Sequence, residues 1–188
     1  LTQSELQELA AQIGSDVPFC IAGGTAIATG RGEQLSPLPS LDNLYIVLGK
    51  HRSLAVSTVW AYSTYRATFG HTYTRNIQNL ESRAQAVHSG SMVKAIIHED
   101  GAEIAQKLHN DLEKVVLPEY PQVSQLRQAF QDSGANGAMM SGSGPTVFAL
   151  CTSLEQAQQV HQQVRQIIPD PDLDLWIARM CSGGIQVS

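Results

Sequence analysis

The chain has 188 residues, a formal net charge of −5, 43% hydrophobic residues and 15% charged residues. This length allows one large or two small domains with an adequate core, and the composition is that of an ordinary globular protein. The acidic balance argues against nucleic acid or an anionic membrane as a partner, because both need an excess of positive charge. No apolar run is long enough to span a bilayer, and no secretory n-region and h-region is visible.

The cysteines and histidines show no metal-binding or disulfide pattern. Cys20, Cys151 and Cys181 lie far apart without CxxC spacing, and the six histidines show neither HxxxH nor HxH spacing. Widely spaced cysteines in apolar surroundings are typical of buried reduced thiols. We therefore expect a cytoplasmic protein without a structural metal site.

The first forty residues predict a helix, a tight break and a hairpin. Thr2 and Ser4 each begin a capping box, and a helix is expected over 2–13. Its helically spaced apolar residues predict one buried stripe, formed by Leu6, Leu9, Ala10 and Ile13. Strands are expected over 25–29 and 33–38, with a glycine turn between them. Proline residues then predict a domain boundary near residue 40.

From residue 41 onward the pattern predicts a strand, several helices, and then strand, helix and strand. A buried strand is expected over 44–48, and a polar loop over 50–53. Further strands are expected over 146–150 and 173–180. Helices are expected from Ser57 or Thr58 to Tyr65, more weakly over 75–89, around 92–97, over 104–115, over 123–130 and over 153–167. This order predicts an α+β sandwich with helices on one face of a mainly antiparallel sheet.

A carboxylate at a backbone break is the first candidate for chemistry. Gly14-Ser15-Asp16-Val17-Pro18-Phe19 lies between the first helix and the hairpin. Asp16 suits a helix N-cap, and Pro18 suits the first turn of the helix that follows. Taken alone, this pattern favours a plain cap over a catalytic residue.

A glycine-rich loop is the second candidate. Ser141-Gly142-Ser143-Gly144-Pro145 precedes the strand expected at 146–150. Its glycines let the backbone approach a ligand or another loop closely, and successive N–H groups can form a nest for an anion. No GK[ST] follows the loop, so it is not a P-loop. Loop chemistry alone favours a tight turn.

Four stretches together resemble the GHMP family of small-molecule kinases. The run from Gly134 to Phe148 is similar to the third signature of that family. The other three resemble one branch, whose acceptor is a CDP-linked methylerythritol. They are Gly14–Phe19 followed by Gly30-Arg31-Gly32-Glu33, Val56–Tyr62, and Asn110-Asp111-Leu112-Glu113. The stretches occur in the family's order and span nearly the whole chain.

The resemblance implies transfer of the γ-phosphoryl group of ATP, with Mg²⁺, to the tertiary 2-hydroxyl of that acceptor. This reaction is a step toward isoprenoid precursors outside the mevalonate route. Asp16 would be the catalytic base, which orients the hydroxyl and takes its proton. The loop residues Ser141, Gly142, Ser143 and Gly144 would support the phosphate site. The segment that helps to hold the cytidine end corresponds to Ser57, Thr58, Trp60 and Tyr62, although a core role for Trp60 or Tyr62 is equally open.

The resemblance also implies two domains and a missing part. Residues 1–40 would be the remnant of a ribosomal-protein-S5-like N-terminal kinase domain, and 41–188 a ferredoxin-like C-terminal domain. The family's N-terminal lysine and GLGGSS-type phosphate loop have no counterpart, since no lysine precedes Lys50. We therefore expect this chain alone to be inactive, and no Mg²⁺ ligand is assigned. The alternatives are a GHMP kinase for homoserine, mevalonate or a sugar, and a non-catalytic substrate-binding module.

Overall fold

The chain folds into two compact units. The computed structural model describes residues 1–73 and 86–185. The first unit comprises 1–42 with the described parts of 77–100 and 180–188, and the second comprises 43–73 and 101–179. Residues 86–100 and 180–185 thus join the first unit although they lie far from it in sequence. The assignment of 1–40 and 41–188 to two kinase domains stays a prediction.

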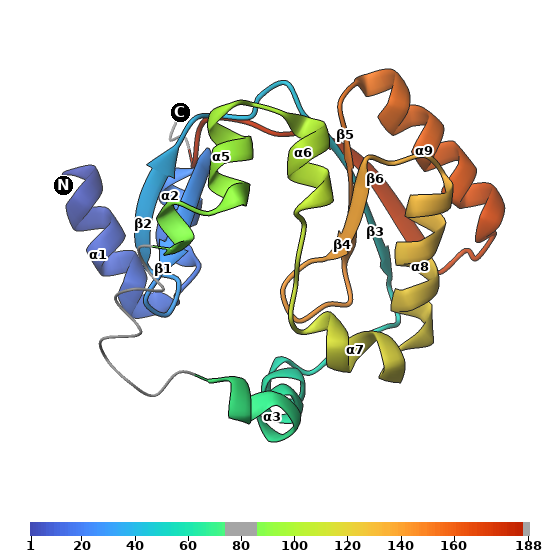
Figure 1. Cartoon of the computed structure of the whole chain (residues 1–188), viewed down its shortest axis with the longest axis horizontal. Helices are drawn as coiled ribbons and strands as arrows, with labels where there is room; N and C mark the ends of the chain where they lie inside the picture. Colours follow the sequence, from blue (N-terminus) through green and yellow to red (C-terminus); the bar gives the residue numbers. More distant parts are fainter. Residues whose placement is uncertain (74–85, 186–188) are drawn as a thin grey trace. The chain divides into compact units, whose positions relative to one another are not determined.

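The first unit contains a helical pair and a two-stranded hairpin (Figure 1). Its elements are α1 (Gln3–Ile13), α2 (Val17–Ala22), β1 (Thr25–Thr29), β2 (Gln34–Leu38) and α5 (Ser91–Ile97). The strands pair antiparallel from Thr25 opposite Leu38 to Thr29 opposite Gln34, which confirms the predicted hairpin. The predicted capping box at Thr2 and Glu5 is also present.

The predicted buried stripe of α1 is wrong. Of its four members only Ala10 is buried, whereas Leu6 is 39%, Leu9 is 49% and Ile13 is 81% exposed. The helical period shows which residues share a face, but it does not show whether another element covers that face. Within the described part of this unit, α1 packs against α2, and most of its apolar face meets solvent.

The second unit is built on a four-stranded antiparallel sheet with the order β4-β5-β3-β6. The strands are β3 (Tyr45–His51), β4 (Gly137–Met140), β5 (Val147–Cys151) and β6 (Leu173–Arg179). The helices are α3 (Thr58–Phe69), the 3₁₀ turn η1 (Gly70–Thr72), α6 (Gly101–Gln106), α7 (Glu113–Glu119), α8 (Pro121–Asp132) and α9 (Leu154–Ile167). This strand order is that of the ferredoxin-like β-α-β-β-α-β arrangement.

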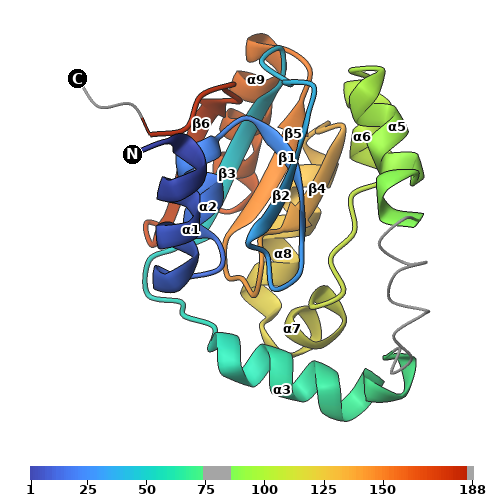
Figure 2. The same ribbon diagram turned by 90° about the vertical axis from the view of Figure 1, so that its left-hand side faces the viewer.

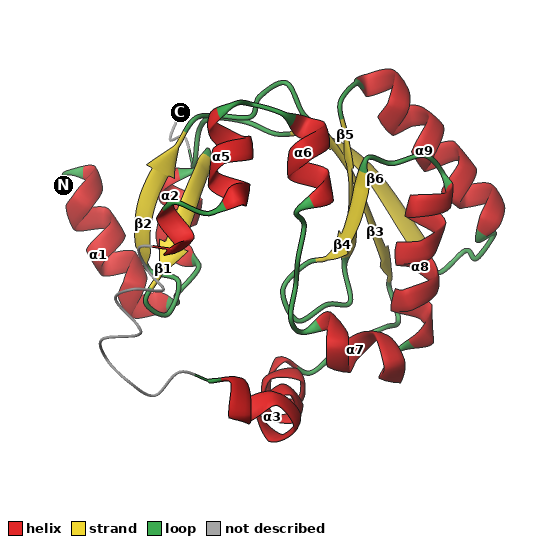
Figure 3. Ribbon diagram, viewed as in Figure 1, coloured by secondary structure: helices red, strands yellow, loops and turns green. Residues whose placement is uncertain are grey.

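Helices α8 and α9 pack side by side on one face of this sheet, as predicted (Figures 1 and 3). Helix α3 packs against α7, which is seen most clearly in Figure 2. The core lies between the sheet and α8 and α9, where Leu126, Phe130 and Val160 are fully buried. Gly49 of β3 leaves room for this packing, because a Cβ atom there would lie 3.0 Å from Phe130.

Two predicted boundaries of the second unit differ from the structure. The polar loop expected at 50–53 is wrong in part, because β3 continues through Lys50 to His51. His51 is buried, with Nδ1 at 3.4 Å from a carboxylate oxygen of Asp170, so a polar residue completes the strand.

The single helix expected over 104–115 is divided into α6 and α7. Between them Asn110 accepts a hydrogen bond from the Leu112 N–H at 3.0 Å, and this local side-chain bond competes with a continuous helix. The weak helix expected over 75–89 lies mostly outside the described residues. Of the part that is described, 86–88 are helical.

Candidate functional site

Asp16 lies at the N-terminus of α2, where its carboxylate makes no capping hydrogen bond. The predicted cap is therefore wrong, although Pro18 occupies the first turn of α2 as expected. Asp16 is exposed, and among the described residues it has no hydrogen-bond or ion-pair partner. The glycine turn of the hairpin lies beside it, since a Cβ atom at Gly32 would be 3.6 Å from Oδ1 of Asp16. The carboxylate is thus free to act on a ligand.

The glycine-rich loop connects β4 to β5 in the second unit. Ser141 N–H donates to the Thr146 carbonyl at 2.8 Å, and Gly144 N–H donates to the Ser141 carbonyl at 2.9 Å. Gly142 and Gly144 have positive φ angles of 55° and 78°. The N–H groups of Gly142 and Ser143 have no protein partner among the residues that the structure describes. Such free amides next to left-handed residues are the elements of an anion nest.

Two side chains from the 110–113 segment hold this loop in place. The Asn110 amide nitrogen donates to the carbonyl oxygens of Met140 and Gly142, each at 2.8 Å. Glu113 accepts a hydrogen bond from the Met140 N–H at 2.7 Å, and the same Oε1 atom lies 3.1 Å from Nε of Arg127. These contacts give the Asn110-Asp111-Leu112-Glu113 stretch a definite role: it supports the loop.

The N-terminus of α3 meets the same loop. Ser57 caps α3 by accepting a hydrogen bond from the Trp60 N–H at 3.3 Å. The hydroxyl of Thr58 lies 2.8 Å from that of Ser143, at hydrogen-bonding distance. Two stretches that are 85 residues apart in the sequence are therefore joined, which places a helix N-terminus next to the free loop amides.

A pocket of about 390 Å³ opens between α3, the 109–112 turn and the loop. It is lined by three tyrosines, by the 109–112 turn, by the end of β4 and by the loop. The lining residues are Tyr62, Tyr65, Tyr73, His109, Asn110, Asp111, Leu112, Met139, Met140 and Gly142. Tyr62 is 56% exposed, so its ring is available to a ligand. Tyr65 and Tyr73 stack with their ring centroids 6.3 Å apart. Aromatic rings with a few polar groups suit a planar, hydrogen-bonding ligand.

The charged groups of the pocket lining, His109 and Asp111, are paired with each other and with the neighbouring Lys114. Asp111 accepts a hydrogen bond from Lys114 Nζ at 2.7 Å, and Nε2 of His109 lies 3.1 Å from the same oxygen. The hydrogen bond from Lys114 is the main cause that lowers the pKa of Asp111, and it likewise raises the pKa of Lys114. Asp111 therefore stays ionised at neutral pH. The Lys114 ammonium also lies 5.6 Å from the centre of the Phe69 ring.

The predicted site residues thus fall into separate roles. Thr58 and Tyr62 reach the loop and the pocket, whereas Trp60 packs edge-on against Tyr120 at 5.4 Å and borders the core. Ser57 acts as a helix cap. The sequence did not single out Tyr65 and Tyr73, because Tyr65 has the helical spacing of a core residue and Tyr73 lies beyond the helix, outside any recognised motif. Their ligand-binding roles, like those of the other site residues, stay predictions.

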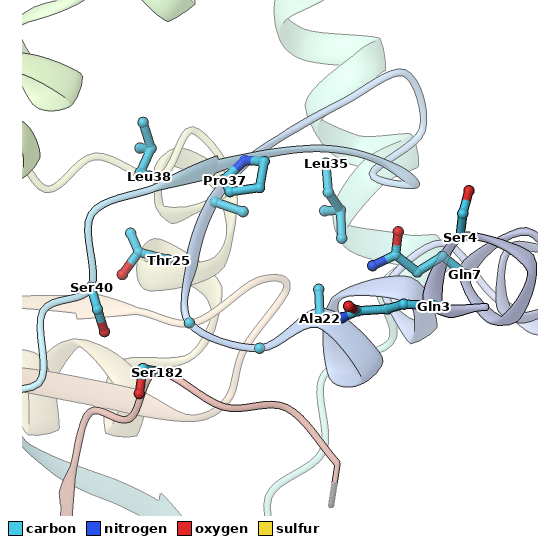
Figure 4. A pocket seen from close by; sticks show the side chains of 13 residues that line it. Gln3, Ser4, Gln7, Ala22, Thr25, Leu35, Pro37, Leu38, Ser40 and Ser182 are labelled. Atoms are coloured by element: carbon cyan, nitrogen blue, oxygen red, sulfur yellow. The ribbon is translucent and has the colours of Figure 1, made fainter.

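A second pocket, of about 370 Å³, lies within the first unit (Figure 4). Its polar lining is uncharged and includes Gln3, Gln7 and Ser182, whereas Leu35 and Pro37 supply an apolar wall.

Among the described residues, no three His, Cys, Asp or Glu side chains are grouped so that they could hold a metal ion. No helix in the described ranges has the length and apolar character needed to cross a membrane.

Comparison with known proteins gives consistent matches. Residues 92–170 match the family model described as GHMP kinases C terminal. Over its full length the chain is 67% identical to a 4-diphosphocytidyl-2-C-methyl-D-erythritol kinase of Trichormus variabilis and spans 59% of that protein. It is 58% identical to a relative of the same name from Gloeothece citriformis, of which it also spans 59%. The chain thus spans less than two thirds of the length of each of these relatives.

Solved structures show the same fold. A homoserine kinase from Cytophaga hutchinsonii superposes with a TM-score of 0.73 at 23% identity, over 98% of this chain and 60% of that one. A 4-(cytidine 5'-diphospho)-2C-methyl-D-erythritol kinase superposes with a TM-score of 0.65 at 24% identity, over 95% of this chain and 57% of that one. The solved structures share the fold, and the match over residues 92–170 shows that the chain carries a GHMP kinase C-terminal domain.

Proposed function

We propose that the whole protein transfers the γ-phosphoryl group of ATP to the 2-hydroxyl of 4-diphosphocytidyl-2-C-methyl-D-erythritol. The observation that carries this proposal is the tyrosine-lined pocket, whose lining includes Gly142 of the glycine-rich loop and Met140 at the adjoining end of β4. A planar base could bind in the pocket while a phosphate binds at the loop. The 67% identity to the Trichormus variabilis enzyme supports the choice of substrate.

In this reaction Tyr62 would contact the cytidine end, and the Gly142 and Ser143 amides would bind phosphate oxygens. Asp16 would orient the acceptor hydroxyl and accept its proton, and positioning would contribute most, since carboxylates are weak bases for alcohols. A free, exposed carboxylate suits this role better than one engaged in a cap. Mg²⁺ would neutralise charge on the ATP phosphates when bound. The described residues form no metal cluster, and no protein ligand is assigned to it.

The relatives are longer than this chain, which spans 59% of the length of the first of them. We propose that an additional N-terminal part completes the ATP site, and that this chain alone does not catalyse the reaction. The exposed apolar face of α1, with Leu9 and Ile13, would then be covered by that part. A cytoplasmic location is expected for an enzyme of this kind.

Calorimetric titration with cytidine 5'-diphosphate tests the proposal. We expect saturable binding to the full-length protein, and we expect uridine 5'-diphosphate and homoserine to bind much more weakly. The full-length protein with ATP, Mg²⁺ and the methylerythritol substrate should release ADP in a coupled assay. Binding of homoserine with turnover, and none with the cytidine compound, would assign the protein to a different member of the family.

A further inference from the structure

We propose that Asn110 is a positioning residue that couples the tyrosine-lined pocket to the glycine-rich loop. Through this coupling the cytidine-containing acceptor in the pocket and ATP at the loop would bind cooperatively. This inference rests on the proposed function and extends it to the way in which the two ligands affect each other's binding. Asn110 is suited to this role because it belongs to both structures: it lines the pocket, and its amide bonds hold the loop.

Every polar group of the Asn110 side chain is engaged. The amide nitrogen donates to the Met140 and Gly142 carbonyls at 2.8 Å, and Oδ1 accepts from Leu112 N–H at 3.0 Å. The two carbonyls flank Ser141, so the amide bridges the end of β4 and the first residues of the loop. An amide is required, because a carboxylate would accept from Leu112 but could not donate to two carbonyl oxygens.

A second contact fixes the same end of β4. Glu113 binds the Met140 N–H at 2.7 Å, and its side chain, 15% exposed, is paired with Arg127. The Met140 peptide group is therefore held through Glu113 at its nitrogen and through Asn110 at its oxygen. Beyond Met140, the described contacts that link the loop to the 110–113 segment come from Asn110 alone. The orientation of the free Gly142 and Ser143 amides thus depends on Asn110, which holds Gly142, and on Thr58, which contacts Ser143.

A ligand in the pocket would touch Asn110, Met140 and Gly142 together. By restricting the motion of these three residues, the ligand would remove part of the entropic cost of ordering the loop. A phosphate group of ATP would then bind the ordered loop more tightly. Thermodynamic linkage requires that ATP in turn tightens binding of the pocket ligand by the same factor. We therefore expect the acceptor to tighten nucleotide binding, and the nucleotide to tighten acceptor binding, by about fivefold or more, within the range usual for coupled sites.

The test uses Asn110→Asp in the full-length protein, with Gln156→Glu as the matched control. Gln156 also donates from its amide to a backbone carbonyl, that of Gly134 at 2.8 Å, and accepts from Thr152, but it lies outside the pocket lining. The dissociation constant of a non-hydrolysable ATP analogue is measured with and without cytidine 5'-diphosphate. The readout is the ratio of the two constants, because a changed affinity for either ligand alone cancels from it.

We expect a ratio of about five or more for the wild type and Gln156→Glu, and a ratio near one for Asn110→Asp. Amide hydrogen exchange of residues 141–146 should become faster in Asn110→Asp, and circular dichroism shows whether the variant is folded. If it is not folded, Thr58→Val, which removes the second link to the loop, should lower the ratio and Thr58→Ser should restore it. A wild-type ratio retained in the folded Asn110→Asp variant would overturn the coupling alone. Absence of cytidine diphosphate binding to the wild type would overturn the proposed function as well.

Discussion

Two glycines of the same loop should respond very differently to alanine. Gly142 and Gly144 both have positive φ angles, of 55° and 78°. At Gly142 an added Cβ atom would meet nothing within 4 Å. At Gly144 it would lie 2.8 Å from Sδ of Met140 and 3.4 Å from Cγ of the same side chain, which is fully buried.

The magnitudes follow from these contacts. The left-handed backbone costs an alanine about 1–2 kcal/mol at either position. Overpacking against Met140 adds about 1–3 kcal/mol at Gly144 only. We therefore expect Gly142→Ala to lower the free energy of unfolding by about 1–2 kcal/mol, and Gly144→Ala by about 2–5 kcal/mol.

Urea unfolding followed by tryptophan fluorescence measures this difference. Both tryptophans, Trp60 and Trp176, lie in the second unit, so the signal reports on the unit that contains the loop. The slope of unfolding free energy against urea concentration should stay constant while the midpoint falls. Equal losses for the two variants, or a larger loss at Gly142, would refute the assignment of the Met140 contact as the cause.

Three further outcomes are expected. Asp16→Asn should abolish nearly all phosphoryl transfer by the full-length protein while its thermal unfolding stays unchanged, since the side chain makes no contact that the fold needs; wild-type turnover would exclude Asp16 as the base. Tyr62→Ala should weaken binding of cytidine 5'-diphosphate by about 1–3 kcal/mol, as measured by calorimetry, and Tyr62→Phe should keep most of the affinity. A hydrogen bond from the Ser53 hydroxyl is the main cause that lowers the pKa of Asp172. A carboxyl group whose pKa is lowered by folding stabilises the folded state. This stabilisation is fully present when the pH is above the pKa of the unfolded chain, and it is lost as the pH falls through the lowered pKa of the folded protein. The wild type should therefore lose more stability than Asp172→Asn on acidification below about pH 4, and parallel urea midpoints for the two proteins would argue against this contribution.

The hairpin and the helices of the second unit could be predicted because their signals are local. Alternation over 25–29, a glycine turn and a returning arm over 33–38 together favour a hairpin from local sequence alone, and the two strands pair as expected. The helix expected over 123–130 is α8, and its helically spaced residues Val123, Leu126, Ala129 and Phe130 are all buried. The helices expected to begin at Ser57 and Ser153 are present, and both serines cap them, because a cap needs only the side chain and the next turn.

Predictions that depended on a neighbour were less secure. The α1 stripe was assumed to be covered, yet Ile13 is 81% exposed. Asp16 matched the cap pattern, but its backbone at φ −89° and ψ −12° is helical, whereas an N-cap residue usually lies in the extended region that aims its side chain at the free amides. Lys50 and His51 extend β3 because Asp174 and Leu173 of β6 lie opposite them, which no local pattern indicates.

The candidate site shows the same division. The sequence by itself determined that a glycine-rich loop, an Asn110-to-Glu113 stretch and an aromatic helix start are present, since each is a short motif of fixed residue types. Only the tertiary structure decided that they meet, with Asn110 bonded to Gly142 and Thr58 to Ser143. It also decided that Tyr62 faces the pocket and Trp60 the edge of the core. The physical reason is that hydrogen bonds between residues 32 or 85 positions apart depend on how the strands and helices pack, and a local pattern carries no information about that packing.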